Sequence, residues 1–393
     1  MMSARPIIRV KPREGRRARA GAPWLFSNEI EMGAAVKALE PGMIVNVLGD
    51  DGRVFGTGTF NPKSLIAVRL LDAAADVALD AAFFAGKLRR ALALREALYE
   101  TPYYRLANAE GDGLPGLTID RFAESCVVQI TAAGMEALLT PLLAALEETL
   151  APTNVILRAD TPARGLEGLG VYVRAAKGDA GRIAVEENGV RYFADPATGQ
   201  KTGWYYDQRD NRAFVARLAR GRSVLDAYCY SGGFALAAAR AGAKEVAGLD
   251  SSAPALALAE DAAAAGHLSC SFVKTEVFEE LERLWAARES FDLVVADPPP
   301  FVKAKKDLEV GAKAYRKLAR LAANVTAKAG ILLLASCSHN ISLERFAAEC
   351  SAGIARAGRS AKLIRLAGAG PDHPIHPMLP ESAYLKALVY ALD

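Results

Sequence analysis

The sequence has no long apolar run and few cysteines and histidines. No stretch approaches the roughly 20 apolar residues of a membrane-spanning helix, and the N-terminus lacks the apolar segment of a signal peptide. Five cysteines without regular spacing predict no disulfide framework, and the four histidines do not form a metal-binding set. These absences predict a protein of the reducing cytoplasm, with no membrane partner and no metal.

The length and the charge distribution give a first outline. A chain of 393 residues is long enough for two or three domains, and 51% hydrophobic with 24% charged residues is usual for a soluble globular protein. The net charge is only +3, but seven basic residues, Arg16 and Arg17 among them, crowd the first twenty positions against the single acid Glu14. Such a block suits a phosphate backbone, and a solvated basic face explains it equally well.

Three regions differ in their expected secondary structure. Residues 1–75 contain short strand-like runs separated by turn residues, which predicts a small all-β module. Residues 76–188 mix helical and strand patterns, which predicts an α+β domain without recognisable chemistry. Residues 189–393 repeat a strand–helix pattern, which predicts an open, mostly parallel, doubly wound sheet. The fold class expected for the whole chain is therefore α/β with two smaller additions.

The most informative stretch covers residues 223–250. A short apolar run ends at Asp226, a turn of small residues follows at Ser231-Gly232-Gly233, and a run of helix formers starts at Phe234. A second apolar run closes on Asp250. This strand–turn–helix–strand unit predicts a site for a nucleoside-containing cofactor, because backbone N–H groups at a helix start attract anions and an acid can hold ribose hydroxyls.

The cofactor that fits this unit best is S-adenosylmethionine. The turn is not the G-x-G-x-x-G expected for a dinucleotide, and Asp226 beside a pyrophosphate is unfavourable. A sulfonium and an ammonium group would instead be stabilised by Asp226, with the ribose on Asp250. An α/β turn without any ligand is the plain alternative.

A second signal is the segment Asp297-Pro-Pro-Pro-Phe301. An apolar strand ends at an acid, and three prolines then form a rigid loop that suits gripping a planar ring. The expected substrate contacts are Pro298, Pro299 and Phe301, with Phe301 stacking on the ring. Such a turn is typical of methyltransferases that act on nucleobases or amides, and a stiff surface turn is the alternative.

The third signal is Cys337, which follows the apolar run 331–335. Cys337 alone among the five cysteines is expected at the carboxyl end of a sheet strand, where ligands bind in this fold. A thiolate adding to carbon 6 of cytosine makes carbon 5 nucleophilic toward the methyl group, and Asp297 could hydrogen-bond or protonate N3. A lone cysteine that merely fills space is the alternative.

These motifs, taken together, resemble a known family. Along nearly the whole chain the sequence resembles bacterial S-adenosylmethionine-dependent ribosomal RNA large subunit methyltransferases I, which make 5-methylcytidine in 23S rRNA. The motifs that carry the resemblance are Pro23-Trp-Leu-Phe-Ser, Asn61-Pro-Lys-Ser, Gly111-Asp-Gly-Leu-Pro-Gly-Leu-Thr-Ile-Asp-Arg, Lys201-Thr-Gly-Trp-Tyr-Tyr-Asp-Gln-Arg-Asp-Asn-Arg, residues 226–234, Asp297-Pro-Pro-Pro-Phe and Ser336-Cys-Ser.

The resemblance implies a domain order and a set of site residues. It implies an N-terminal β-barrel-like PUA domain that binds RNA, a central α+β domain and a C-terminal Rossmann-like class I methyltransferase domain, with Cys337 as the nucleophile. It also places the segment from Thr202 to Arg209, which precedes the sheet, and Glu276, which follows the third strand, near the cofactor. The expected cofactor contacts are Thr202, Gly203, Gln208, Arg209, Asp226, Tyr228, Ser231, Gly232, Gly233, Phe234, Asp250, Ser251, Glu276 and Asp297.

The sequence departs from the family pattern at three positions. Glu276 stands where the family more often has Asp, and Trp204 replaces a commoner Phe. Pro300 stands where other RNA cytosine-5 methyltransferases carry a second cysteine, so another group would have to assist release of the enzyme. The expected partner is 23S rRNA or a precursor of the large subunit, and the oligomeric state is open, a homodimer included.

Two other functions are compatible with the same motifs. An RNA exocyclic-amine methyltransferase would use the Asp297-Pro-Pro-Pro-Phe301 loop without a cysteine. A non-catalytic RNA-binding assembly factor would retain the fold without binding the cofactor, although the intact Asp226, glycine turn and Asp250 argue against it.

Overall fold

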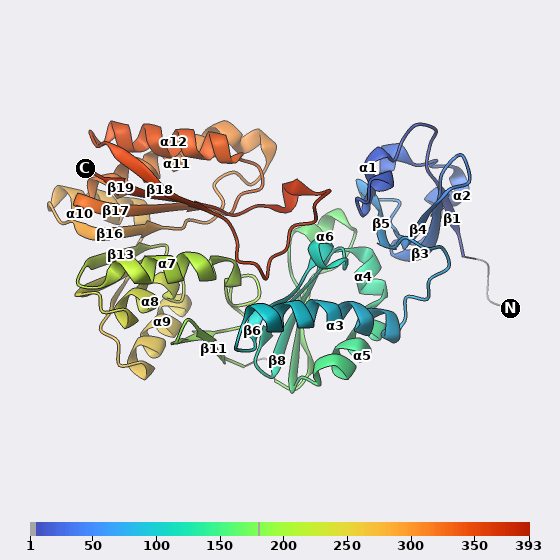
Figure 1. Cartoon of the computed structure of the whole chain (residues 1–393), viewed down its shortest axis with the longest axis horizontal. Helices are drawn as coiled ribbons and strands as arrows, with labels where there is room; N and C mark the ends of the chain where they lie inside the picture. Colours follow the sequence, from blue (N-terminus) through green and yellow to red (C-terminus); the bar gives the residue numbers. More distant parts are fainter. Residues whose placement is uncertain (1–4, 180) are drawn as a thin grey trace. The chain divides into compact units, whose positions relative to one another are not determined.

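The computed structural model describes residues 5–179 and 181–393 and divides the chain into two compact units (Figure 1). The first unit comprises residues 1–181, 195–204 and 371–380, and the second comprises residues 182–194, 205–370 and 381–393. Residues 1–4, part of the N-terminus that is predicted to lack a signal segment, lie outside the described residues. In the described part of the chain, every helix is too short or too polar to span a bilayer.

The first sheet of unit 1 confirms the all-β module expected at the N-terminus. Its five strands lie in the order β1-β3-β4-β5-β2 around a core that includes Val45, Phe60 and Val68. The elements are β1 (Ile7–Arg9), α1 (Arg16–Arg19), β2 (Trp24–Phe26), η1 (Ser27–Glu29), α2 (Ala34–Lys37), β3 (Met43–Leu48), β4 (Val54–Phe60) and β5 (Ile66–Asp72).

The remainder of unit 1 is an α+β region with a second five-stranded sheet in the order β10-β9-β8-β7-β6. Leu88 of α3 and Leu142 of α5 pack in one apolar core with this sheet. The elements are α3 (Ala81–Leu98), β6 (Tyr103–Asn108), η2 (Ala109–Asp112), β7 (Leu117–Phe122), β8 (Ser125–Ile130), α4 (Ala133–Ala137), α5 (Leu139–Leu150), β9 (Asn154–Ala159), α6 (Ala163–Leu166) and β10 (Tyr172–Lys177).

Unit 2 is the expected doubly wound α/β domain, preceded by the hairpin of β11 (Ile183–Glu187) and β12 (Val190–Ala194). Its sheet has the order β15-β14-β13-β16-β17-β19-β18, and all pairs are parallel except those made by β19. The strands are β13 (Ser223–Ala227), β14 (Glu245–Asp250), β15 (Ser271–Lys274), β16 (Phe291–Ala296), β17 (Thr326–Ser336), β18 (Ala361–Ala367) and β19 (Lys386–Leu392).

Helices cover both faces of this sheet (Figure 1). Helices α10, α11 and α12 share one apolar core with the sheet, and α7 and α8 share another. The helices are η3 (Tyr206–Gln208), α7 (Arg209–Ala219), α8 (Gly233–Arg240), α9 (Ala253–Ala265), α10 (Val277–Ala286), η4 (Lys305–Asp307), α11 (Leu308–Asn324), α12 (Leu343–Arg356) and η5 (Pro380–Ser382).

The compact units do not run along the chain as the expected domains do, since residues 195–204 and 371–380, expected in the C-terminal domain, belong to unit 1. The predicted boundary between residues 188 and 189 falls in the turn of the β11–β12 hairpin, and both strands belong to unit 2. Because the ladder of backbone hydrogen bonds joins the two strands into one element, we expect the domain limit to lie before β11. The further division of unit 1 near residue 75 stays a prediction.

Candidate active site

The candidate site lies at the point in the sheet of unit 2 where the order of the strands reverses. Strand β13 has β14 on one side and β16 on the other, so the chain order reverses there, and ligands of open α/β sheets bind beyond the carboxyl ends of such strands. Five predicted site residues sit at or just after consecutive strand ends, namely Asp226, Asp250, Glu276, Asp297 and Cys337. The fold therefore brings together groups that lie as much as 111 residues apart in the sequence.

Asp226 is the group in this site that most clearly requires a ligand. It is fully buried in β13, and its Oδ2 accepts a hydrogen bond of 2.9 Å from the backbone N–H of Ala235. Its Oδ1 is buried without any hydrogen-bond partner in the described chain. Burial, together with the charges of Asp297 and Asp250, raises the pKa of Asp226 to about 7. A cationic ligand at Oδ1 would satisfy this oxygen and favour its charged form.

The turn after β13 is shaped to bring its backbone close to a ligand. Tyr228, Tyr230 and Gly232 all have positive φ, of 66°, 49° and 79°. A Cβ at Gly232 would lie 3.0 Å from the Cβ of Ala259, so space as well as conformation favours glycine there. The hydroxyl of Ser231 is buried and makes no hydrogen bond to the described residues. It is a second polar atom that a ligand would satisfy.

The acids after β14 and β15 form the other side of this turn. Asp250 accepts hydrogen bonds from the backbone N–H groups of Tyr230 (2.9 Å) and Ser252 (2.8 Å), which hold its carboxylate toward the turn. Burial raises the pKa of Tyr228, and the charges of Glu276 and Asp250 add to this effect. Both acids are thus close to Tyr228, as a shared binding site for a nucleoside requires. Ser251 is exposed beside them.

This arrangement fits S-adenosylmethionine. It combines two buried oxygens without a hydrogen-bond partner, on Asp226 and Ser231, with an open turn and adjacent acids. Asp226 suits the cationic amino acid portion, the start of α8 suits its carboxylate, and Asp250 suits the ribose. The plain alternative of a turn without a ligand leaves these two buried oxygens unexplained.

Asp297 is held by a residue that lies 89 positions earlier in the chain. The side-chain amide of Gln208 donates to Asp297 Oδ2 at 2.8 Å, and its oxygen accepts from Asn211 at 2.7 Å. The amide group of Gln208 therefore positions Asp297, and the cofactor contact expected for Gln208 from the sequence stays a prediction. The sequence gives no signal for the contribution of Asn211.

The proline loop after Asp297 is anchored by aromatic packing. The ring of Phe301 lies 4.8 Å from that of Tyr315 and 5.9 Å from that of Phe278. The backbone N–H of Phe301 also donates to the hydroxyl of Tyr315 at 3.4 Å. Phe301 therefore holds the loop, and its stacking on a substrate stays a prediction. Pro298 is buried in the loop and Pro299 is exposed on it.

Cys337 leaves the sheet beside Asp297. Strands β16 and β17 are parallel neighbours with Ala296 opposite Leu334, so both residues emerge at the same edge. Burial raises the pKa of Tyr205 and raises that of Tyr315 to about 12, and the charges of both Asp297 and Cys337 contribute to each shift. The carboxyl group and the thiol thus lie within electrostatic range of the same two tyrosines, and Cys337 is only partly buried.

Lys386 is a buried cation next to Cys337 that the sequence does not reveal. It lies opposite Ser336 in the β17–β19 pair, and its Nζ donates to the carbonyl oxygens of Ser338 (2.7 Å) and Tyr384 (3.0 Å). Burial lowers the pKa of Lys386, and the charge of Cys337 opposes that shift. A cation so placed favours a thiolate.

The other cysteines are poorly suited to nucleophilic chemistry. Cys126, Cys229 and Cys350 are buried, and burial raises the pKa of Cys126 to about 12. Burial also raises the pKa of Cys270 to about 11. These shifts disfavour the reactive thiolate.

Several predicted residues lie elsewhere in the chain. Arg209 is buried in an ion pair with Glu187 at 3.4 Å. Thr202 and Gly203 belong to unit 1, where the Thr202 hydroxyl donates to Asp120. Arg16 and Arg17 are exposed on the short helix α1. Cofactor contact for Arg209, Thr202 and Gly203 and RNA contact for Arg16 and Arg17 stay predictions.

Comparison with known proteins identifies two domains. Residues 8–73 match the family model of a PUA-like domain, and residues 178–391 match that of an S-adenosylmethionine-dependent methyltransferase. The chain is 37% identical over 390 residues to ribosomal RNA large subunit methyltransferase I of Shewanella denitrificans, with 97% of this chain and 98% of the relative covered. The protein of that name from Shewanella frigidimarina is 36% identical with the same coverage.

Solved structures agree on the fold. A structure from Streptococcus mutans, described as a SAM-dependent methyltransferase, has a TM-score of 0.83 at 20% identity and covers 98% of this chain and 100% of its own. A methyltransferase solved in complex with SAH has a TM-score of 0.84 at 20% identity with the same coverage. The match of residues 178–391 confirms S-adenosylmethionine as the cofactor. The chain belongs to the ribosomal RNA large subunit methyltransferase I family of S-adenosylmethionine-dependent methyltransferases.

Proposed function

We propose that this protein transfers a methyl group from S-adenosylmethionine to carbon 5 of a cytidine in 23S ribosomal RNA. The names of its relatives and its PUA-like domain support a large-subunit rRNA substrate. The observation that carries the choice of atom is the pair of Asp297 and Cys337, which leave adjacent strands beside the cofactor turn.

The proposed reaction uses this pair on opposite edges of the base. The thiolate of Cys337 adds to carbon 6 of cytosine while Asp297 donates to or protonates N3, which accepts the displaced electron pair. Carbon 5 then attacks the methyl group and S-adenosylhomocysteine leaves. A base removes the carbon-5 proton, and the bond between sulfur and carbon 6 breaks to release the thiol. Gln208 holds Asp297 in place for the first step.

The base must leave its helix to reach such a site, as it does in other enzymes that act on nucleobases. The anchored proline loop next to Asp297 would then face the base. Its three prolines remove backbone N–H groups and rotational freedom, so the loop keeps its shape when the base enters.

The experiment that tests this function uses RNA that contains 5-fluorocytidine. Fluorine cannot leave as the proton does, so the covalent adduct between protein and RNA should persist after methyl transfer and migrate as one band under denaturing conditions. Cys337→Ala should form no adduct, whereas Cys270→Ala should form it as the wild type does. Absence of an adduct in the wild type, or an equal yield from Cys337→Ala, would contradict the covalent mechanism.

Nucleoside mass spectrometry of treated 23S rRNA identifies the methylated atom. The expected product is 5-methylcytidine. N4-methylcytidine or N6-methyladenosine would instead assign the site to exocyclic-amine methylation. No methylated product, together with no rise of the melting temperature on adding S-adenosylmethionine, would indicate a non-catalytic RNA-binding factor.

A further inference from the structure

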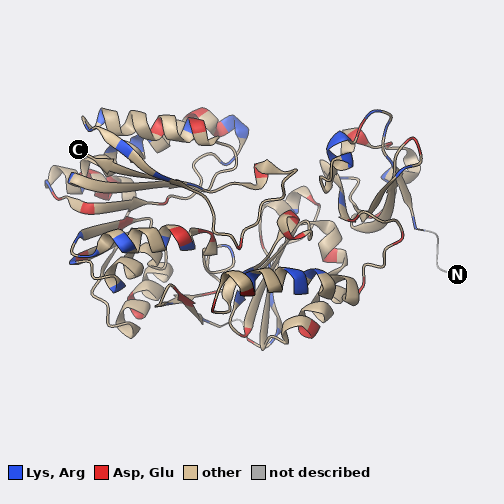
Figure 2. Ribbon diagram, viewed as in Figure 1, with Lys and Arg blue, Asp and Glu red and all other residues tan. Residues whose placement is uncertain are grey.

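A groove between α11 and α12 gathers five cations away from the candidate active site. Basic and acidic residues are interspersed over most of the chain (Figure 2), but the lining of this hollow of about 570 Å³ is entirely basic. We call it the α11–α12 basic groove, and its residues are Lys313, Arg316, Lys317, Arg320 and Arg356.

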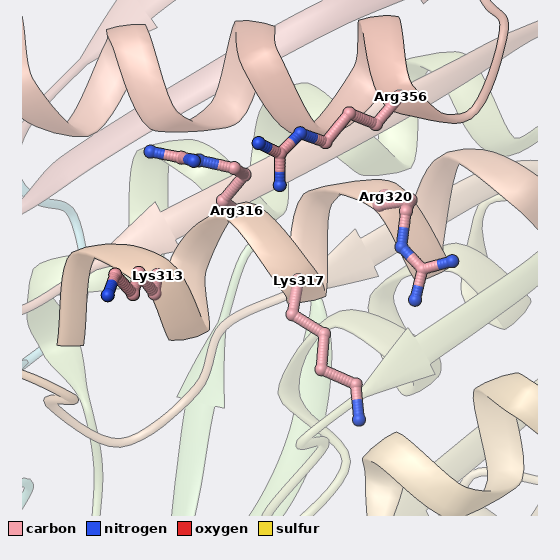
Figure 3. Close-up of a pocket in the computed structure, with 5 residues that line it drawn as sticks. All are labelled: Lys313, Arg316, Lys317, Arg320 and Arg356. Carbon is pink, nitrogen blue, oxygen red and sulfur yellow. The ribbon is translucent and has the colours of Figure 1, made fainter. Parts of the chain in front are cut away.

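The arrangement of these cations follows from helix geometry. The four on α11 have the spacing i, i+3, i+4 and i+7, which places them along one face, while Arg356 projects from α12 toward them (Figure 3). The opposite face of α11 buries apolar side chains such as Tyr315 and Leu318 in the core of unit 2. The groove is therefore built on a rigid element.

The groove is not neutralised by its surroundings. Arg316 pairs with Glu349 at 2.6 Å and Lys317 with Glu282 at 3.0 Å. Lys313, Arg320 and Arg356 make no ion pair with any carboxylate in residues 5–179 or 181–393. Five cations against two carboxylates leave a net charge of +3. Like charges three and four residues apart cost a helix a few tenths of a kcal/mol per pair, so this stripe opposes helix stability.

The same helix also supports the candidate active site. Tyr315, on the inner face of α11, accepts a hydrogen bond from Ser336 at 2.8 Å and packs against Phe301 of the proline loop. Between that loop and α11 the chain carries three exposed lysines at positions 303, 305 and 306. Exposed basic residues thus occur on both sides of the acids Asp307 and Glu309, next to the proline loop and in the groove.

We propose that the α11–α12 basic groove binds phosphate groups of the RNA strand that flanks the target base. Phosphodiesters are the polyanions that the proposed substrate offers, and the inference rests on the proposed function only in taking large-subunit rRNA as that substrate. Contacts of this kind fix the register of an RNA without reading its sequence. The groove would therefore hold the strand while the proline loop receives the base.

The test neutralises the three cations that make no ion pair. The variant Lys313→Gln/Arg320→Gln/Arg356→Gln keeps the pairs of Arg316 and Lys317 and thus the packing of α11. The control Arg240→Gln/Lys328→Gln/Lys362→Gln removes the same charge from exposed positions of unit 2. The probe is transcribed 23S rRNA, with binding measured by filter retention at several salt concentrations.

The groove variant should bind this RNA at least about tenfold more weakly near 0.1 M salt, and the slope of log affinity against log salt should fall by about 2 to 3. Its KM for RNA should rise with kcat unchanged, and its melting temperature should rise with S-adenosylhomocysteine as in the wild type. The control should stay within about twofold of the wild type.

Equal affinity and equal salt slope in the two variants would overturn the proposal. So would a groove variant that binds naked rRNA normally and loses binding only to particles containing ribosomal proteins, because the groove would then contact a protein. Failure of the wild type itself to bind or methylate the rRNA would contradict the proposed function instead, so the two failures are distinguishable.

Discussion

At the scale of single residues, the buried carboxyl group of Asp226 should make the stability of the protein depend on pH. Its pKa of about 7 lies above the value near 3.9 of an unfolded chain. Between these values the native state binds more protons, so the ligand-free protein loses stability as the pH rises from about 4 to about 7. The loss in free energy of unfolding is at most about 4 kcal/mol and has reached its full size at pH 8.

Asp226→Asn removes this loss of stability. In urea unfolding the ligand-free variant should be more stable than the wild type at pH 8, and the difference should shrink as the pH is lowered to 5. The variant should also lose the stabilisation by S-adenosylmethionine. Asp292→Asn is the control, because hydrogen bonds from Ser223 lower the pKa of Asp292 and its replacement should bring no gain at pH 8. An equal gain in both variants would contradict the role of burial.

Lys386 allows a second test at the scale of residues. Removing its charge in Lys386→Met should disfavour the thiolate of Cys337, which like Asp297 lies within electrostatic range of Tyr205 and Tyr315. The rate of alkylation of Cys337 by iodoacetamide at pH 7, followed by peptide mass spectrometry, should fall several-fold. Lys386→Arg keeps the positive charge and should retain most of the alkylation rate of the wild type. An unchanged rate in the methionine variant would show that Lys386 only supports the strand.

The sequence identifies some residues of this site and misses others for a physical reason. Asp226, Asp250 and Cys337 each close an apolar run, and strand ends meet at one edge of a parallel sheet, so local pattern is enough to predict their place. The contact of Gln208 with Asp297 joins residues 89 positions apart. Lys386 begins a strand whose antiparallel register decides what it faces, and no local pattern carries that information.

At the scale of elements, the β11–β12 hairpin is joined to α7 by a buried ion pair. Both oxygens of Glu187 accept from Arg212, at 2.6 and 2.8 Å, and both side chains are nearly inaccessible. Glu187→Gln leaves the buried cations of Arg212 and Arg209 without their shared counter-charge, and breaking one buried pair typically costs about 3–5 kcal/mol. Urea unfolding should show a loss of this size.

The neighbouring residue provides the control for this prediction. Glu186 pairs with Arg191 at 3.2 Å, but both side chains are about half exposed. Glu186→Gln should therefore cost less than about 1 kcal/mol. Similar losses in the two variants would mean that burial of the Glu187 pair does not determine its contribution.

Elements with a strong periodic pattern are the ones that the sequence predicts. Asp226, Asp250 and Cys337, which close or follow apolar runs in the sequence, lie within one residue of the ends of β13, β14 and β17. Strand β2 has only three residues, too few to show an alternation, and its pairing with β5 defines it. The composition of Asn188-Gly189 is that of a hairpin turn, and it does not indicate to which domain the hairpin belongs.

At the scale of the whole molecule, two basic surfaces are proposed to contact RNA: the exposed Arg16 and Arg17 of α1 in unit 1, and the α11–α12 basic groove in unit 2. Two contacts carried by one chain act as a bivalent binder, since the first raises the effective concentration of the second. On a long rRNA, losing either surface should therefore lower the affinity markedly.

Arg16→Gln/Arg17→Gln should weaken binding of transcribed 23S rRNA by several-fold and lower the salt slope by about 1 to 2. Combined with the groove variant, it should weaken binding further than either variant alone, because neither surface would then hold the RNA. A short RNA hairpin can contact only unit 2. The α1 variant should bind this RNA like the wild type, whereas the groove variant should bind it more weakly. If the α1 variant lost affinity equally on the short hairpin and on the long RNA, the two surfaces would not act as separate contacts, because α1 would then bind next to the target base itself.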